Sequence, residues 1–257
     1  MVELITLGSG SRGNSTLLRT ARSAILIDAG LTARQLFLRL EAVDQDPSSI
    51  DAIVITHEHS DHICGVPVFT RRTSTCVRAN EAAVASAGPT LQNAATLKTF
   101  TTGRSFEAGD FTITPFPISH DAAEPVGFTL EAEGIITGYA TDLGHAGHEV
   151  VERLTGCEIV VLESNHDRNM LFTGPYPPLT KQRVDSDHGH LSNEAAAELL
   201  IKLIPGGTRK IVLAHLSETN NIPRLARAVV EGALRRNDME GISLHVASQK
   251  RPGDPVS

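Results

Sequence analysis

Three histidines and two carboxylates lie within six consecutive residues of this sequence. The short apolar run 53–55 is followed almost directly by His57, Glu58, His59, Asp61 and His62. Imidazole and carboxylate groups packed this closely destabilise a fold unless a bound partner compensates them, and a divalent metal ion would do so. His57 and His59 point to the same side of an extended segment, whereas Asp61 and His62 follow where a helix should begin. We therefore predict two metal ions, one at each pair; the alternative is a polar loop of solvated histidines.

A second pattern repeats along the chain, because apolar runs end in an acidic residue or a histidine. Five such runs, residues 25–27, 53–55, 135–141, 159–162 and 211–214, lead to Asp28, His57, Asp142, Glu163 and His215. Sites in sheet proteins commonly lie beyond the carboxyl ends of strands. We therefore expect these five ends to meet at one edge, although a single acid after a strand is usually a turn residue or a helix cap.

The elements that must position these residues alternate between short apolar runs and segments of helical periodicity. We predict strands over residues 2–7, 16–19, 24–27 and 242–247, and a hairpin around Glu133-Gly134. We predict helices over residues 33–42, 63–73, 193–204 and 223–236, with Thr32 and Ser192 at two of the helix starts. Residues 173–190 are rich in proline and are predicted to form a long loop without helix, and the polar tail after residue 249 is predicted to be frayed.

The glycine-rich segment 8–15 follows the first predicted strand. It contains Ser11 and Arg12 and has many backbone donors, so it could wrap an anion; a plain turn is the alternative. The two β-rich, helix-flanked halves of the chain are of similar length. They predict one domain over residues 1–257, built from two stacked mixed sheets.

Composition narrows the function classes. The chain has 257 residues and a formal net charge of −7, which argues against a sequence-independent DNA coat protein. A nuclease remains possible, because two divalent cations would add four positive charges in the site itself. The three cysteines do not indicate a disulfide framework. The sequence has no basic leader and no apolar stretch of membrane-spanning length, so we predict a cytoplasmic protein that is not bound to a membrane.

The order of these motifs resembles the metallo-β-lactamase fold and, more closely, the WalJ (YycJ) family of exonucleases. The matching motifs are spread over almost the whole chain: residues 8–14, 27–30, 56–62, 119–125, 140–144, 163–167, 186–193, 214–217 and 220–221. The resemblance implies the α/β class, with an αβ/βα sandwich of four layers in which two mixed β-sheets are flanked by helices. It also implies a site with two metal ions at the sheet edge.

The resemblance further implies a role for individual residues of the site. One metal ion would be held by His57, His59 and His120, and the other by Asp61, His62 and His215, with Asp142 bridging both. Asp28 would orient a ligand histidine from behind. His166 competes with His120 for the first metal ion or acts in catalysis. His190 resembles a histidine that assists phosphodiester cleavage in tRNA-processing nucleases, which implies a proton donor or a phosphate contact.

The activity implied is metal-dependent phosphodiester hydrolysis, expected to be 5′-to-3′ exonuclease action on DNA rather than RNA, with a role in DNA repair. A hydroxide bridging two Zn²⁺ or Mn²⁺ ions would attack phosphorus. The expected catalytic residues are Asp61, His190 and His166. The expected substrate contacts are Ser11, Arg12, Arg168, Lys181, Arg183 and Asn220.

Two other functions fit the ligand pattern. One is a thioester or lactone hydrolase with the same dinuclear site, and the other is a metal-stabilised regulatory binding protein. The 73 positions from Asp142 to His215 are too few for the nucleic-acid-clamping domain that larger nucleases insert there. We therefore expect loops or the partner subunit of a homo-oligomer to grip a long substrate.

Overall fold

Thirteen strands form two sheets, and the apolar runs of the sequence supply most of them. The computed structural model describes residues 1–257. The first sheet consists, in spatial order, of β1 (Glu3–Gly8), β2 (Ser15–Arg19), β3 (Ala24–Ile27), β4 (Ala52–Val54), β5 (Cys76–Asn80) and β6 (Thr96–Phe100). The second consists of β13 (Ser243–Val246), β12 (Lys210–Ala214), β11 (Ile159–Glu163), β10 (Ile135–Ala140), β9 (Val126–Ala132), β8 (Phe111–Pro117) and β7 (Phe106–Ala108).

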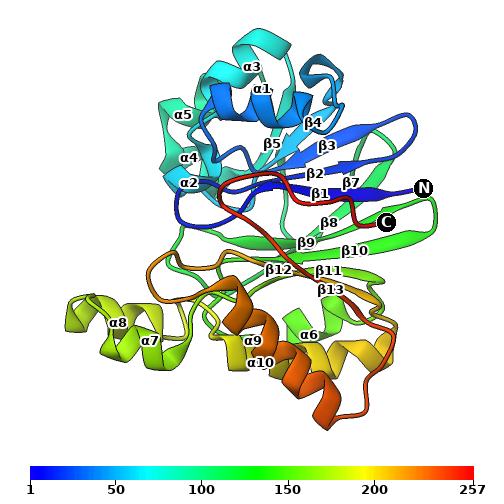
Figure 1. Ribbon diagram of the computed structural model, residues 1–257. Coiled ribbons are helices and arrows are strands. Elements are labelled where there is room, and N and C mark those ends of the chain that lie inside the picture. Colours follow the sequence, from blue (N-terminus) through cyan, green and yellow to red (C-terminus); the bar gives the residue numbers. More distant parts are fainter.

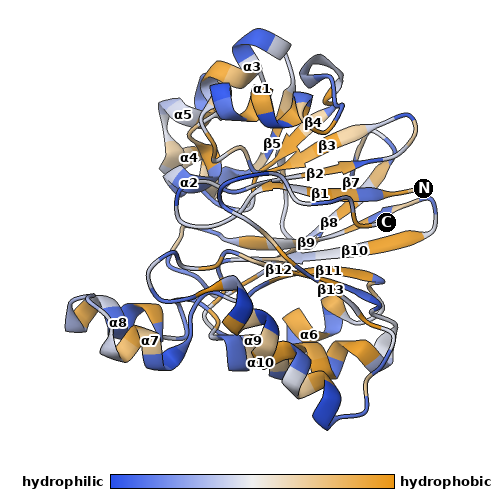
Figure 2. Cartoon of the chain, viewed as in Figure 1, coloured by the Kyte–Doolittle hydropathy of each residue, from blue (hydrophilic) through white to orange (hydrophobic).

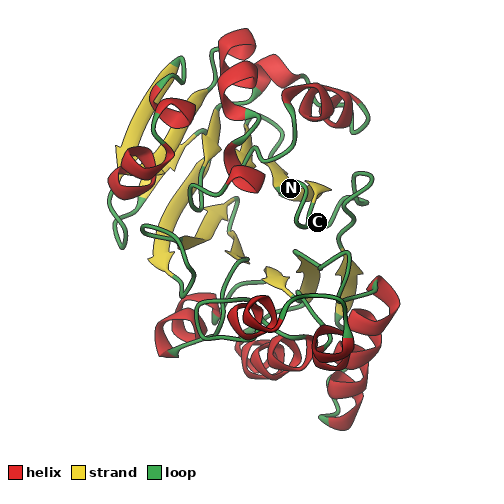
Figure 3. Ribbon diagram, turned by 90° about the vertical axis from the view of Figure 1, so that its left-hand side faces the viewer, coloured by secondary structure: helices red, strands yellow, loops and turns green.

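Both sheets are mixed, and helices cover their outer faces, which gives the protein four layers (Figure 1; Figure 3). The first half of the chain contains α1 (Ala33–Glu41), η1 (Pro47–Ser49), α2 (Ser60–Ile63), α3 (Val66–Thr73), α4 (Glu81–Ala87) and α5 (Pro89–Gln92). The second half contains α6 (His148–Leu154), α7 (Arg168–Thr173), α8 (Pro178–Val184), α9 (Asn193–Leu203), η2 (Ile204–Gly206) and α10 (Pro223–Arg236). The predicted αβ/βα sandwich is confirmed. None of the helices combines the length and the apolar character that crossing a bilayer requires.

Alternating side chains explain why the strands are buried on both faces. Along β4, Val54 packs into the core between the two sheets, while Ile53 packs under the helices of the first half. Along β11, Val161 faces the core between the sheets, while Val160 and Leu162 face α9 and α10. Successive residues of a strand point to opposite faces, so each apolar run contributes side chains to two cores, one on either side of its sheet. Figure 2 shows the apolar residues concentrated on the strands and the adjoining helices.

The long loop predicted over residues 173–190 contains a helix, so that part of the prediction is wrong. Helix α8 starts at Pro178 and ends at Val184. Proline fits the first turn of a helix, where its missing N–H would have no partner in any case. The prolines at 177 and 178 therefore mark a helix start rather than a region without helix. Figure 1 shows α7 and α8 projecting from the body of the protein.

The tail after residue 249 is not frayed, contrary to the prediction. It crosses from β13 to the first sheet and runs beside β1 (Figure 1). The backbone of Val256 exchanges two hydrogen bonds with Leu4, each of 2.9 Å, and the side chain of Val256 is buried in the core between the sheets. The tail therefore covers the edge strand β1, whose unpaired backbone would otherwise be open to pairing with another chain.

Candidate metal centre

The site lies where the carboxyl ends of strands from both sheets come together, as the five apolar runs predict. Asp28 follows β3 and His57 follows β4 in the first sheet, while Asp142 follows β10 and His215 follows β12 in the second. The metal loop then enters α2, which carries Asp61 and His62.

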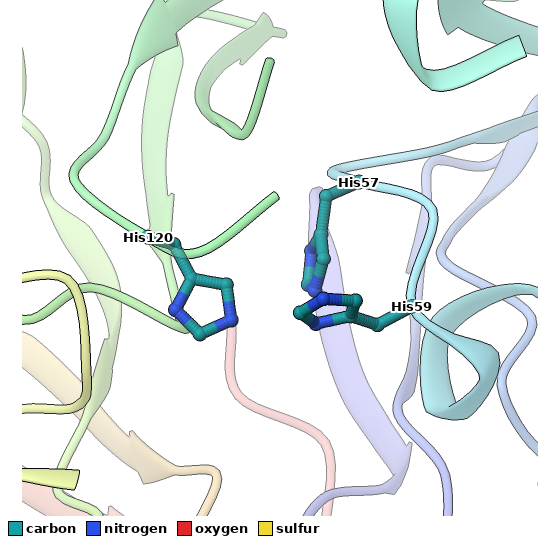
Figure 4. A group of neighbouring side chains, drawn as sticks. All are labelled: His57, His59 and His120. Atoms are coloured by element: carbon teal, nitrogen blue, oxygen red, sulfur yellow. The ribbon is translucent and has the colours of Figure 1, made fainter. Parts of the chain in front are cut away.

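The structure brings the predicted ligands into overlapping groups. The ligand atoms of His57, His59 and His120 lie within 4.8 Å of one another, and Figure 4 shows their three rings directed toward a common point. A second group of the same compactness consists of Asp61, His62 and His215. Asp142 lies between them, because it groups with His57 and His62 and also with His215. Asp142 is therefore within reach of both groups.

Buried polar atoms without partners test whether these residues suit metal ions. Nε2 of His57, Nε2 of His215 and Oδ2 of Asp142 are buried and accept or donate no hydrogen bond within the protein. Leaving such atoms unpaired destabilises a fold by roughly 1–3 kcal/mol each. Imidazole nitrogens and carboxylate oxygens are the ligands of zinc and also permit manganese. The donor set therefore fits divalent cations.

Hydrogen bonds behind the ligands fix which ring nitrogen faces the cluster. Nδ1 of His62 donates to Asp28 at 2.7 Å, and Nδ1 of His120 donates to the carbonyl of Gly189 at 3.1 Å. The Thr56 hydroxyl donates to Asp28, so its oxygen accepts the hydrogen bond of 3.0 Å from Nδ1 of His57. In each ring Nε2 faces the cluster, and such support through the other ring nitrogen is typical of histidine ligands. Nε2 of His62 also lies 3.1 Å from the amide nitrogen of Asn14, and Nε2 of His120 lies 3.2 Å from Asp121. Asp28 thus lies behind His62, on the side of the ring away from Nε2.

Glu163 is one of the five strand ends predicted to meet, but no role in the site was predicted for it. Its carboxylate accepts hydrogen bonds from Nδ1 of His215 at 2.7 Å and from Nδ1 of His190 at 2.9 Å. It also accepts the backbone N–H groups of Leu143 and Leu191. The available signal was its position at the end of an apolar run, in the same pattern as Asp142 and His215. One carboxylate therefore orients both a proposed ligand and the proposed proton donor.

The pKa values show how strongly the charges are coupled. Burial alone would lower the pKa of His215, but Asp142, Asp61 and Glu163 together raise it to about 10. Burial alone would raise the pKa of Glu163, but His190 and His215 hold it at about 2. Burial and the neighbouring His62 lower the pKa of His57 well below its usual range. His215 thus differs from His57, whose lowered pKa favours the neutral form that a metal ligand needs.

Three residues of the site adopt a left-handed backbone that side chains rarely accept. Asp28, Asp142 and His215 have φ values of 59°, 59° and 53°. Such conformations cost about 1–3 kcal/mol each and persist where the surroundings enforce them. The backbone N–H of His215 donates to Ser9 at 2.7 Å, which anchors this turn from the first sheet. The strained turns direct Asp142 and His215 into the cluster and Asp28 to the position behind His62.

A cavity of about 270 Å³ opens beside the cluster. In addition to the proposed metal ligands, it is lined by Ser11, Tyr176, Arg183, His190, Ser217 and Asn220. Four predicted site residues, Ser11, Arg183, His190 and Asn220, thus share one cavity.

Three predicted substrate contacts do not line this cavity. Arg12 pairs with Glu218 at 2.7 Å, and Arg168 pairs with Asp185 at 3.0 Å. Nζ of Lys181 donates to the carbonyl of Phe172 within the projecting helices. A nucleic acid could reach these cations only on the outer surface of the protein.

Neither His166 nor the glycine-rich loop has the surroundings that its sequence motif suggested. His166 is fully buried, and Nε2 lies 3.5 Å from Asp185 rather than among the metal-binding groups. In the loop, the N–H groups of Gly10, Arg12, Gly13 and Asn14 are all bonded within the protein. The loop is therefore a structural turn with Ser11 at its tip, and it does not wrap an anion with its backbone.

Comparison with known proteins places this site in context. Residues 23–216 match the family described as the Beta-lactamase superfamily domain. Exodeoxyribonuclease WalJ of Streptococcus pneumoniae is 36% identical over 241 residues, covering 91% of this chain and 88% of that protein. Exodeoxyribonuclease YycJ of Bacillus anthracis is 34% identical over 251 residues, covering 96% and 95%. The metallo-beta-lactamase fold protein YhfI of Bacillus subtilis superposes with a TM-score of 0.74 at 15% identity, covering 99% and 100%.

Proposed function

This chain belongs to the metallo-β-lactamase superfamily, within the family of WalJ and YycJ, and we propose that it is a metal-dependent exonuclease that shortens DNA from a strand end. The observation that carries the proposal is the convergence of Asp142 with two groups of histidines, beside a cavity that also contains His190. The names of the two relatives support DNA as the substrate. The 5′-to-3′ direction stays a prediction from the resemblance.

The proposed site holds two divalent ions, Zn²⁺ or Mn²⁺. His57, His59 and His120 would hold one, and Asp61, His62 and His215 the other, with Asp142 shared. When bound, such ions supply positive charge that acidifies water and offsets the charge developing on phosphoryl oxygens. His166 lies outside these groups and does not line the cavity, so it is assigned no step.

The chain's own residues supply proton transfer and orientation. Burial alone would raise the pKa of the Asp61 carboxyl group, but the neighbouring His215 and His62 lower it, so Asp61 is ionised. It can therefore accept a hydrogen bond from the attacking water and orient it. His190 is held through Nδ1 by Glu163, which leaves Nε2 to deliver a proton to the leaving oxygen. Ser11, Arg183 and Asn220 line the same cavity and would contact the substrate there.

The deciding experiment combines metal analysis with digestion of DNA and RNA strands labelled at either the 5′ or the 3′ end. We expect DNA to be shortened from one end in the presence of Zn²⁺ or Mn²⁺. Asp142→Ala should abolish turnover and lower the metal content. His190→Ala should keep its metal and slow cleavage by roughly 10²–10⁴-fold.

His245→Ala provides the control, because His245 lies on β13 outside the site. The activity of this variant should match that of the unaltered chain. An acyl thioester tested in parallel separates the proposal from the other hydrolase function. Intact DNA alongside a hydrolysed thioester would contradict the proposal, as would full activity in Asp142→Ala.

A further inference from the structure

Tyr176 is the one phenylalanine, tyrosine or tryptophan side chain among the residues that line the cavity beside the metal cluster. The chain has two tyrosines and no tryptophan, and the other tyrosine, Tyr139, is buried in the core between the sheets. Tyr176 is only partly buried. A planar ring at the wall of a catalytic cavity offers a face on which a flat ligand can stack.

The backbone around Tyr176 is restricted by its neighbours. Pro175, Pro177 and Pro178 surround it, and proline fixes one of the two backbone torsions of each residue. Gly174 packs so closely on Asn220 that a Cβ atom there would lie 2.9 Å from the amide oxygen. The segment is therefore a stiff bridge between α7 and α8, laid against the cavity wall. A tyrosine side chain has only two main torsions, and on a stiff backbone little further conformational entropy is lost when a ligand stacks on its ring.

Asn220 gives an independent indication that this end of the cavity receives a ligand. Its side chain is 1% exposed, and neither the nitrogen nor the oxygen of its amide has a hydrogen-bond partner in the protein. The same residue lines the cavity with Tyr176. A buried amide without partners is unfavourable unless a ligand or water supplies them. The wall therefore offers a donor and an acceptor beside the aromatic face.

The size of the cavity limits what can enter. Its volume of about 270 Å³ lies just below the range of roughly 300–1,000 Å³ common for small-molecule pockets. That space suits a single nucleotide and excludes an intact length of duplex. Tyr176, Asn220 and Arg183 line the same cavity. The aromatic face matches a base, the amide without partners matches the polar edge of that base, and the guanidinium matches a phosphate.

We propose that Tyr176 is the platform on which the nucleobase at the strand end stacks, so that the terminal nucleotide is unpaired when its phosphodiester bond is cut. The proposal rests on the exonuclease function above and specifies how that site grips its substrate. Every base has a π face, so stacking holds the strand end without selecting a sequence. A duplex substrate must fray by at least its last base pair before cleavage.

The test is a thermodynamic cycle. The base is removed from the end of the substrate and the ring is removed from residue 176 of the protein, first separately and then together. The substrates are single strands that differ only in carrying a base or an abasic site at the cleaved end. With the unaltered chain, removal of the base should raise KM by about 5- to 150-fold, the factor that corresponds to stacking worth about 1–3 kcal/mol. With Tyr176→Ala both substrates should show the same high KM. Tyr176→Phe should restore the preference for the base, because it keeps the ring.

Phe172→Ala is the matched control, because Phe172 lies on α7, is 52% exposed and does not line the cavity. It should behave like the unaltered chain. Metal content should be the same in all variants. If Tyr176→Ala still distinguishes the base from the abasic site, or if the unaltered chain does not, the platform is refuted although nuclease activity stands. Absence of cleavage on every strand would instead refute the exonuclease function on which the platform depends.

Discussion

At the scale of single residues, Glu163 connects the two chemical roles of the site. Its carboxylate accepts hydrogen bonds from both His215 and His190. We therefore expect Glu163→Gln to lower both the metal affinity and the cleavage rate, by roughly 10- to 100-fold each. A glutamine amide offers one acceptor oxygen and no charge in place of the carboxylate. Metal titration and steady-state kinetics measure the two effects.

Glu158→Gln is the control for this prediction, because Glu158 pairs with Lys210 at the surface, away from the cluster. It should leave metal affinity and cleavage rate unchanged. If Glu163→Gln matched that control, Glu163 would have only a structural role.

The protonation of His215 should make the stability of the metal-free protein depend on pH. Its pKa is about 10 in the folded protein, against an ordinary value of 6.5. A raised folded pKa contributes stability that is complete below about pH 6.5 and is lost as the pH rises toward 10. With the metal removed by a chelator, we therefore compare the free energy of unfolding of the unaltered chain with that of His215→Gln. The excess stability of the unaltered chain should decrease from pH 6.5 to pH 10.

Denaturant unfolding at several pH values measures this trend. With saturating metal the trend should reverse, because binding needs the neutral imidazole and competes with protons. A difference between the two chains that is independent of pH in chelator would contradict the coupling of His215 to its carboxylates.

Residue types and close spacing made most of the cluster predictable. His57, His59, Asp61 and His62 are neighbours in the sequence, so their proximity required no knowledge of the fold. Glu163 could not be assigned in the same way, because its partners lie 27 and 52 positions away. Its role depends on β11 lying between β10 and β12, and pairing of distant strands is not written in any local pattern.

At the scale of elements, Gly30 allows the turn after β3 to contact the metal loop. A Cβ atom at Gly30 would lie 1.6 Å from the backbone oxygen of Asp61. Gly30→Ala must therefore push the loop that carries Asp61 and His62. We expect a loss of stability of about 1–3 kcal/mol and a lower metal content. Thermal unfolding and metal analysis provide the two measurements.

Gly147→Ala is the matched control, because its nearest neighbour would lie at an ordinary contact distance of 3.6 Å. Normal metal content in Gly30→Ala would show that the loop moves away at no cost to the site.

Some elements could be predicted because their ends are marked locally. The hydroxyl of Thr32 accepts the N–H of Gln35 at the start of α1, and Ser192 accepts that of Ala195 at the start of α9. Both helices begin where the capping pattern predicted. Helix α8 was missed because it is short and is stabilised by its position beside the site, for example through Arg183 and Asp121, rather than by an apolar repeat of its own.

At the scale of the whole molecule, the tail connects the two sheets. Val256 is buried between them, and Gly253 and Val256 bond the backbone of β1. Deleting residues 252–257 should cost about 1.5–3 kcal/mol from the lost apolar contact alone, and it should expose the β1 edge to self-association. Thermal unfolding and size-exclusion chromatography read out these effects.

Deletion of Ser257 alone is the control, because this residue is exposed and should not matter. A monomeric deletion variant of unchanged thermal stability would show that the tail is dispensable. The sequence suggested fraying because the tail is polar. What holds it is one valine and a backbone ladder, and neither is visible in composition.

The division of the site between the two sheets has a consequence for biosynthesis. The first sheet delivers His57, His59, Asp61 and His62, and the second delivers Asp142 and His215. A nascent chain that has emerged only through its first sheet holds four of the seven proposed ligands, because His120, Asp142 and His215 come later, and it lacks both Glu163 and His190. The proposed site is therefore complete only after the chain has been synthesised through His215 and the two sheets have packed together.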